Sequence, residues 1–251
     1  MLIISYSQTD VGRKRNHNED FHFADDVLGL YIVADGVGGQ ARGEVASKEA
    51  VEQVHNWVLS HRSLIENYKK TPEESYVFKI RRMLESGIQS ACYMVFGISD
   101  QIGDGRKMAT TMSVALFIEN VLFIGQVGDS RIYRLREGEI LQLTEDHTLL
   151  NYKLKQGLIT PEEAVNFKKK NVITRAVGHM DYVEPDIFHY GVESGDRYLL
   201  CSDGLHGYFH NLDEIAEILS DELPSVPGKF IELANSRGGK DNITAIVLEL
   251  F

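Results

Sequence analysis

The chain has 251 residues, of which 26 are Lys or Arg and 37 are Asp or Glu, so its formal net charge is −11 at pH 7. Hydrophobic residues make up 43% and charged residues 25%, a composition typical of a folded globular protein. The negative net charge argues against a nucleic acid as partner, because phosphate backbones favour positively charged proteins. No apolar run approaches the ~20 residues that cross a bilayer, so no association with a membrane is expected.

The cysteine content and the N-terminus bear on the compartment. Cys92 and Cys201 are too few for a disulfide framework, and they favour a reducing environment. No basic stretch precedes an apolar segment at the N-terminus, so a secretory signal is not expected. We therefore expect a cytoplasmic protein. No linker-like stretch and no internal repeat interrupts the sequence, which predicts one domain over residues 1–251.

In the N-terminal half, residues 30–34 form a near-continuous apolar run, the pattern of a strand buried on both faces. Apolar residues at helical spacing over residues 46–58 predict a helix. A Thr-Pro-Glu-Glu segment beginning at Thr71 supplies a capping residue, a proline at the first helical position and a glutamate three residues after the cap. An apolar stripe over residues 77–98 then predicts a second, long helix.

The C-terminal half adds more strands than helices. Residues 132–135 and 140–143 predict a hairpin around the loop 136–139. A second Thr-Pro-Glu-Glu segment begins a short helix at Thr160. Further strands are predicted at 114–118, 121–127, 197–201 and 243–250, and further helices near 213–219 and 229–236. This order lacks the strict alternation of a doubly wound parallel sheet and favours an α+β fold in which helices pack outside antiparallel sheets.

Four aspartates lie at the ends of predicted strands: Asp35, Asp129, Asp203 and Asp241. An aspartate followed by glycine, as at Asp35 and Asp203, is a common turn signal, and each pair taken singly favours that interpretation. If the strands are neighbours, however, the carboxylates converge and must be protonated or bind cations. Oxygen-only ligands select Mg²⁺ or Mn²⁺ over zinc. Two such ions about 3.5–4 Å apart can share a carboxylate and activate a water.

A charged segment near the N-terminus runs from Arg13 to Asp20. It can be a solvated loop. A guanidinium beside carboxylates is also the arrangement that holds a phosphate next to metal ions, because its planar fork matches phosphate oxygens. The segment therefore adds a candidate phosphate contact to the candidate metal ligands.

Together these segments form a series of motifs: RNHNED at 15–20, DGVGG at 35–39, GDSR at 128–131, SDGL at 202–205 and DN at 241–242. In this order the series resembles the metal-dependent Ser/Thr protein phosphatases, the PPM or 2C-type family, in its bacterial branch. Lesser matches are MATT at 108–111 and TRAVG at 174–178. The resemblance covers essentially the whole chain. It implies a four-layer α/β/β/α sandwich of two antiparallel sheets flanked by helices, with the metal site at one end between the sheets.

The resemblance also implies roles for individual residues. Asp35 would bridge two ions and the Gly36 carbonyl would bind one of them. The other implied metal ligands are Asp203 and Asp241, together with Asp129 for a third ion. Glu19 and Asp20 would hold waters of the ions, and Arg15 would grip the substrate phosphate. The implied cofactor is Mn²⁺ or Mg²⁺, and a flap is expected at about residues 151–170.

The expected function is hydrolysis of phosphoserine and phosphothreonine on proteins by a metal-activated water, by a monomer that opposes Ser/Thr kinases in bacterial signalling. Two alternatives stay open: a catalytically silent binding module of the same fold, and a phosphatase dedicated to one regulatory protein such as an anti-sigma antagonist. Val37 departs from the histidine that eukaryotic members place after Asp-Gly, so the group that protonates the leaving oxygen is open. Ala109 replaces the usual glycine of Gly-Thr-Thr, a mild change.

Other chemistries find little support. The position six residues after each cysteine holds Ile98 or Gly207, where a cysteine-dependent phosphatase needs arginine. Neither a Gly-x-Ser-x-Gly elbow nor a P-loop lysine occurs. His206 and His210 are four residues apart, but without a third ligand they are interpreted as a surface pair and not as a zinc site. The lysines at 168–170 are interpreted as a solvated face, with attraction of a phosphoprotein as the alternative.

Overall fold

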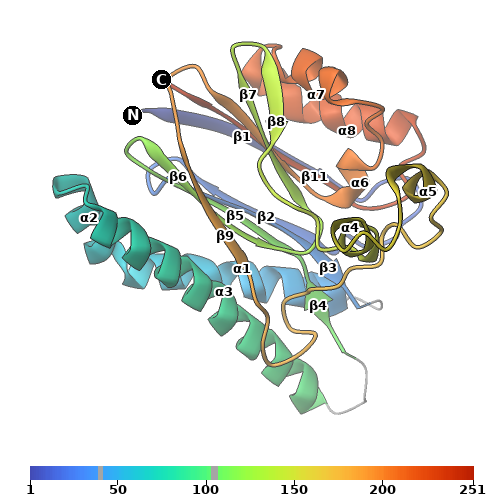
Figure 1. Cartoon of the computed structure of the whole chain (residues 1–251), viewed down its shortest axis with the longest axis horizontal. Coiled ribbons are helices and arrows are strands. Elements are labelled where there is room, and N and C mark those ends of the chain that lie inside the picture. The colour runs from blue at the N-terminus through green and yellow to red at the C-terminus, as the bar shows by residue number, and fades with distance from the viewer. Residues whose placement is uncertain (39–41, 103–106) are drawn as a thin grey trace.

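A computed structural model describes residues 1–38, 42–102 and 107–251. Two antiparallel β-sheets lie face to face, and helices cover the outer face of each (Figure 1). The layers therefore run helix, sheet, sheet, helix. The α+β sandwich expected from the sequence is confirmed. None of the described helices has the length and apolar character needed to cross a bilayer.

Sheet A has the strand order β1-β11-β10-β7-β8. Its strands are β1 (Ile3–Asp10), β7 (Arg131–Arg136), β8 (Glu139–Gln142), β10 (Arg197–Cys201) and β11 (Ile243–Leu250). The last two match the predicted strands. The hairpin β7–β8 is present, but its loop has two residues instead of four. Glu137 and Gly138 both have positive φ (50° and 83°), as two-residue hairpin turns require.

Sheet B has the order β2-β3-β5-β6-β9, and β4 pairs with β3. Its strands are β2 (Asp20–Asp25), β3 (Leu30–Val37), β4 (Ala109–Thr110), β5 (Met112–Ile118), β6 (Val121–Val127) and β9 (Asp186–Gly191). The predicted strands are the central ones. The edge strands β1, β2 and β9 were not predicted, because they mix exposed and buried residues and so lack a continuous apolar run.

Helices on the outside of sheet B are α1 (Arg42–Ser60), α2 (Arg62–Lys70) and α3 (Glu74–Ile102). Those on sheet A are α6 (Asp203–His206), α7 (Leu212–Leu219), the 3₁₀ helix η1 (Leu223–Ser225) and α8 (Val226–Ser236). The predicted start of the long helix at Thr71 is wrong. Thr71 instead ends α2, its N–H donating to the Asn67 carbonyl (3.0 Å), and α3 begins at Glu74.

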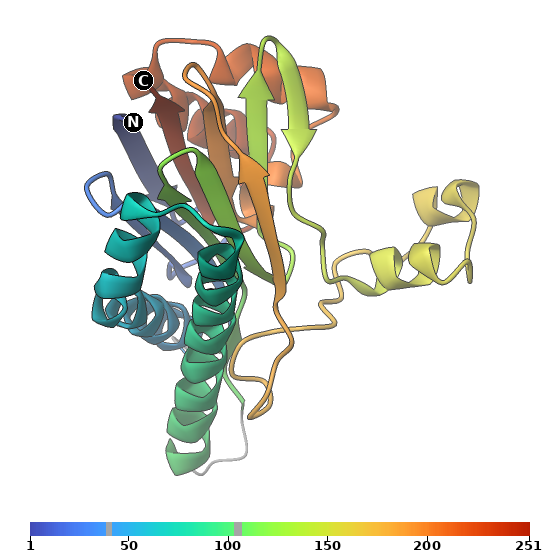
Figure 2. The same ribbon diagram turned by 60° about the vertical axis from the view of Figure 1, so that its left-hand side comes forward.

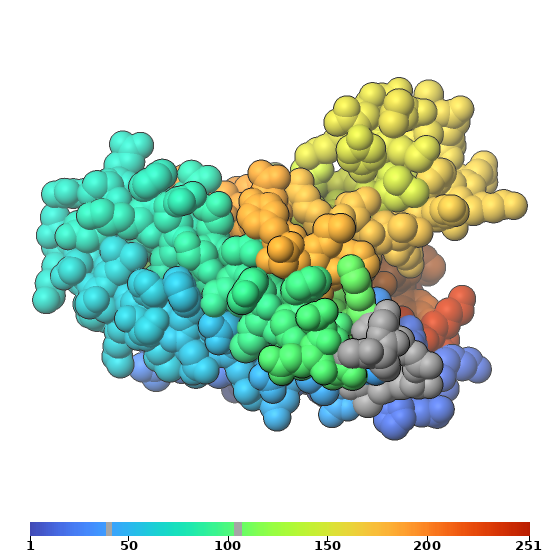
Figure 3. All heavy atoms as spheres, turned by 90° about the horizontal axis from the view of Figure 1, so that it is seen from below, coloured from blue at the N-terminus to red at the C-terminus, as the bar shows by residue number. Residues whose placement is uncertain are grey.

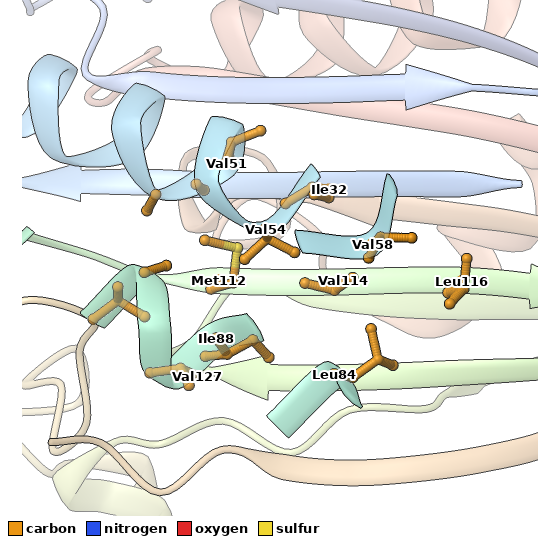
Figure 4. Close-up of a cluster of buried hydrophobic side chains, with 14 of the residues drawn as sticks. Ile32, Val51, Val54, Val58, Leu84, Ile88, Met112, Val114, Leu116 and Val127 are labelled. Carbon is orange, nitrogen blue, oxygen red and sulfur yellow. The ribbon is translucent and has the colours of Figure 1, made fainter. Parts of the chain in front are cut away.

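The core explains why the central strands are apolar on both faces. In β3, Leu30, Ile32 and Ala34 belong to a cluster that also includes residues of α1, α3, β5 and β6. Figure 4 shows Ile32 within this cluster. Tyr31 and Val33 alternate with them and pack between the two sheets. A third cluster joins sheet A to α7 and α8. Because helices cover one face and a sheet the other, alternation of polar and apolar residues is lost.

A separate lobe leaves the sandwich between β8 and β9. It contains α4 (Leu149–Lys155) and α5 (Pro161–Val165), and it stands beside the body in Figures 2 and 3. Thr160 caps α5 with the capping box expected from its sequence. The two ends of the lobe meet, since Leu149 N donates to the Val172 carbonyl (2.8 Å). The lobe is therefore anchored to the sandwich at one place.

Candidate metal centre and substrate cavity

A cavity of about 660 Å³ opens at the end of the sandwich where β3, β6 and β10 finish and β11 begins. Arg15, Glu19 and Gly36 line it, and Thr174, Arg175 and His179 contribute further lining from the segment that follows the lobe. The lining also contains all four strand-end aspartates, Asp35, Asp129, Asp203 and Asp241. Segments far apart in the sequence thus bring their carboxylates into one cavity. Gly39, in the second motif, lies outside the described residues.

Asp35 is held through its backbone. It lies in β3 opposite Asp20 of β2. Its N–H donates to Thr111 Oγ1 (2.9 Å), and its carbonyl accepts from Thr111 N (2.9 Å) and Thr110 Oγ1 (3.0 Å). The two threonines therefore fix the main chain of Asp35 and leave its carboxylate to the cavity. Ala109, beside them, is 6% exposed and pairs with Val37 in a regular strand contact, which fits a mild substitution.

The glycines that follow Asp35 and Asp203 permit close packing. A Cβ at Gly36 would lie 2.1 Å from the Gly43 carbonyl oxygen in α1, and a Cβ at Gly204 would lie 1.9 Å from the Asn242 carbonyl oxygen. Gly36 is inside β3, Gly204 is inside α6, and neither has positive φ. The interpretation of these Asp-Gly pairs as turns is therefore wrong. Each glycine admits a neighbouring backbone beside the aspartate.

Asp129 enters the cavity from the loop after β6. Gly128 has φ of 94°, a left-handed conformation that suits glycine, and it turns the chain toward the cavity. Gly128 and His147 exchange two hydrogen bonds: Gly128 N donates to His147 Nδ1 (3.2 Å), and His147 N donates to the Gly128 carbonyl (2.9 Å). Asp129 itself is 4% exposed. The loop is thus fixed on the side that faces the lobe.

His206 fixes the same loop from the other side. Its Nε2 donates to the Asp129 carbonyl oxygen (2.8 Å). Burial, and then repulsion by the nearby Arg131, lower the pKa of His206 to about 4. His210 is exposed. The sequence interpretation of a surface pair therefore holds for His210 only, because His206 is partly buried and its ring is hydrogen-bonded to the main chain near the candidate metal ligands.

Asp20 connects the two sheets beneath the cavity. From β2 of sheet B, its Oδ2 accepts hydrogen bonds from Ser202 Oγ (2.7 Å) and Thr244 Oγ1 (2.6 Å), both in sheet A or its loops. Its Oδ1 is buried without a hydrogen-bond partner. Burial raises the pKa of Asp20 to about 7, although the two hydroxyl groups act in the opposite direction. One oxygen therefore binds sheet A, and the other is a buried acceptor with unused capacity next to the residues that line the cavity.

The carboxylates of the cavity disfavour one another's charge. Burial, and then repulsion by Asp20, Asp203, Asp129 and Asp241, raise the pKa of Asp35 well above its usual value. Burial, and then repulsion by Asp203, raise the pKa of Asp129 to about 7. Burial and Asp241 raise the pKa of Asp203. Such a cluster needs protons or cations to be stable.

The donor atoms suit a hard divalent cation. Asp203 lines the acidic cavity, and its Oδ1 is buried without a hydrogen-bond partner, so this residue has an acceptor with unused capacity. The carboxylates and the carbonyl of Gly36 offer only oxygen, which favours Mg²⁺ or Mn²⁺. Within the described part of the chain, no three His, Cys, Asp or Glu side chains form a ready-made metal-binding group. The oxygens thus surround the cavity without closing on one point.

Arg15 and Glu19 lie at the rim. Arg15 Nη2 donates to Asp241 Oδ2 (2.8 Å), and the two side chains are 48% and 35% exposed. The backbone of Glu19 is fixed, because its N–H donates to Asn242 Oδ1 (2.8 Å) and its carbonyl accepts from Gly36 N (3.1 Å). The N-terminal motif is therefore docked on the last one, and the side chain of Glu19 faces the cavity.

The comparisons with known proteins agree with this geometry. The family model for protein phosphatase 2C matches residues 10–228. The serine/threonine phosphatase stp of Listeria monocytogenes serotype 4b is 38% identical over 248 residues, which cover 96% of this chain and 94% of the relative. The crystal structure of the Mycobacterium tuberculosis serine/threonine phosphatase PstP/Ppp has a TM-score of 0.86 and 32% identity, covering 100% of this chain and 99% of that one.

A further solved structure is similar and contains metal. The catalytic domain of the serine/threonine phosphatase PstP, in complex with two manganese ions, has a TM-score of 0.81 and 32% identity. The match covers 99% of this chain and 98% of that one. The likeness therefore extends over the whole fold, including the end of the sandwich where the carboxylates gather.

Proposed function

This chain belongs to the protein phosphatase 2C family and is a metal-dependent phosphatase of phosphoserine and phosphothreonine in proteins, and we propose that the acidic cavity is its active site. The observation that carries the proposal is the gathering of four strand-end carboxylates, largely without cationic partners, beside the guanidinium of Arg15. An acidic cavity repels a phosphate unless cations neutralise it.

We assign the metal ligands as follows. Asp35, the Gly36 carbonyl, Asp203 and Asp241 hold two ions, and Asp129 holds a third. The partnerless Oδ1 of Asp203 and the raised pKa of Asp35 support this assignment. The ions are Mn²⁺ or Mg²⁺, since every donor is an oxygen. When bound, such ions lower the pKa of water and neutralise charge on phosphoryl oxygens.

The remaining residues bind and orient. Glu19 and Asp20 accept hydrogen bonds from water at the edge of the site, and Asp20 can do so with its free Oδ1. Arg15 Nη2 donates a hydrogen bond to Asp241, and the other N–H groups of the guanidinium can bind two oxygens of the substrate phosphate. Val37 lines the cavity and is 46% exposed, but its side chain has no proton to give. The proton of the leaving oxygen must therefore come from water or from another group in the cavity.

The substrates are phosphoproteins, and we propose that they are products of a Ser/Thr kinase that this enzyme opposes. We also propose one domain over the chain, acting as a monomer, with the segment at about 151–170 as a flap beside the cavity. Cys92 and Cys201 are buried and free, which fits the reducing cytoplasm. A phosphatase dedicated to one regulatory protein has the same cavity, and comparison of phosphoproteins in parent and deletion strains separates the two.

The direct test is turnover of phosphoseryl and phosphothreonyl peptides by the full chain. We expect activity with Mn²⁺, its loss in EDTA, and its return when Mn²⁺ is added in excess. A nitrophenyl phosphate assay run in parallel separates poor peptide binding from failed chemistry. Full activity in the chelator would contradict the assignment of the carboxylates to metal ions. No activity under any condition would favour the silent binding module.

A further inference from the structure

His206 joins two loops that come from different sheets. It lies in α6, three residues after Asp203, so it belongs to the segment that follows β10 of sheet A. Its Nε2 donates to the Asp129 carbonyl (2.8 Å), in the loop that follows β6 of sheet B. One short helix therefore carries one candidate metal ligand and holds the main chain of another.

The helix that carries His206 is a rigid support. Gly204 packs so closely on Asn242 that a Cβ would lie 1.9 Å from its carbonyl oxygen, which leaves α6 no room to shift toward β11. The helix is also closed on itself, since Gly207 N donates to the Asp203 carbonyl (2.8 Å). A carbonyl oxygen only accepts, so Nε2 of His206 carries the hydrogen and the imidazole acts as a fixed donor.

The Asp129 carboxylate depends on its backbone for orientation. Within the described residues, no other residue donates a hydrogen bond to its carboxylate oxygens, although the side chain is almost fully buried. Its main chain is held by two imidazoles, His147 at Gly128 and His206 at Asp129 itself. Of these, His206 acts on the residue that carries the carboxylate and ties it to the helix of Asp203.

We propose that His206 is a positioning residue, which sets the place of the Asp129 carboxylate relative to Asp203 and thereby the affinity for the third divalent ion. The inference rests on the proposed role of Asp129. Loss of the hydrogen bond frees the left-handed turn at Gly128 and lets the carboxylate move away from Asp203. The two-ion core, held by Asp35, Asp203 and Asp241, keeps its own ligands.

The experiment is a calorimetric titration of the metal-free full chain with Mn²⁺, for the parent and three variants. His206→Phe keeps a ring of similar size without the donor. His206→Gln places an amide N–H near the position of Nε2. His210→Gln is the matched control on the exposed histidine four residues away. Circular dichroism and the melting temperature establish that each variant is folded.

We expect the parent to bind two ions tightly and one weakly. In His206→Phe the weak ion should bind about 10-fold less tightly, the size expected when a hydrogen bond of ~1.4 kcal/mol is lost. The two tight ions should stay within about threefold. His206→Gln should recover most of the weak binding, and His210→Gln should match the parent. If His206→Phe does not fold, the comparison of His206→Gln with an analogous His206→Leu variant makes the same distinction.

Several results would overturn the proposal. They are a parent that binds only two ions, a His206→Phe titration equal to the parent, a His206→Gln variant as weak as His206→Phe, and equal loss of all ions. The titration contains no substrate, so it stands apart from the phosphatase assay. A parent that fails to hydrolyse phosphopeptides would refute the proposed active site and leave the metal-binding result to be judged separately.

Discussion

Strand β10 has an aspartate at each end, and the two are held in opposite ways. Asp196 directly precedes the strand, and its side chain is 1% exposed. Its carboxylate accepts from Arg136 Nε and Nη2 (2.6 Å each), from the Tyr198 hydroxyl (2.9 Å) and from Glu193 N (3.0 Å). Asp203 follows the strand at the cavity, and its Oδ1 is buried with no partner.

The pKa values of the two carboxyl groups shift in opposite directions. Burial alone would raise the pKa of Asp196, but the hydrogen bonds from Arg136, Glu193 and Tyr198 lower it. Burial raises the pKa of Asp203, and Asp241 adds repulsion. At the Asp196 end, the charged carboxylate stabilises the fold through its ion pair with Arg136. The cavity end holds unfavourable charge in the absence of cations, which is the condition for strong binding of cations and then of phosphate.

The largest expected effect is at the cavity end. Asp203→Asn should reduce phosphopeptide turnover at least ~100-fold at fixed Mn²⁺, because a ligand of the ion core loses its charge. The same change should leave the melting temperature of the metal-free protein unchanged or raise it, since it removes repulsion from Asp35 and Asp241. Turnover and differential scanning calorimetry in EDTA check both parts. A strongly destabilised metal-free variant would remove the contrast with Asp196.

Arg15 is a cation at the cavity end, and its effect should come through the substrate. A charge-assisted contact is worth about 1.5–3 kcal/mol, so Arg15→Ala should lower kcat/KM roughly 10- to 200-fold. Arg15→Lys should recover part of the loss, because lysine lacks the planar fork. Steady-state kinetics over a range of Mn²⁺ provides the measurement. If excess Mn²⁺ cured the deficit, Arg15 would support the metal ligands instead of the phosphate.

At the other end of β10, the same substitution should affect stability only. Asp196→Asn should lower the free energy of unfolding by about 2 kcal/mol, because buried charged hydrogen bonds to Arg136 are lost. Activity should match the parent at temperatures where the variant is folded. Urea unfolding and phosphopeptide turnover on the same sample test this, with Glu193→Gln as a control for the exposed neighbour of the ion pair. A large loss of turnover would mean that the two ends are coupled.

The smallest expected effect is the pH dependence of the difference in unfolding free energy between the parent and Asp196→Asn. The pKa of Asp196 is lowered from 3.8 by its partners, so its contribution is present above that value and is lost as pH falls through the lowered pKa. The difference in unfolding free energy between parent and Asp196→Asn should be constant from about pH 7 to pH 5 and shrink below about pH 4. Unfolding in urea at a series of pH values measures it. A difference that grows on acidification would contradict the assigned pairing.

The sequence was most informative where one physical signal dominated. Strands in the middle of the sheets are covered on both faces, so β3, β6, β10 and β11 appear as apolar runs and could be predicted. Edge strands such as β1 and β9 have mixed surroundings and gave no such signal. Thr71 shows a limit of local rules, because the same residue type can end one helix or begin the next, and only the packing of α2 decides.

The amino-acid sequence is enough to place the four aspartates at strand ends and to give the order of the motifs. The folded structure is needed to see that Gly36 and Gly204 serve close packing, that Asp20 bridges Ser202 and Thr244, and that His206 holds Asp129. Strand ends and helix caps depend on neighbours along the chain, so a local sequence pattern can indicate them. Contacts between residues of different sheets depend on how the two sheets pack, and a local sequence pattern contains no information on that packing.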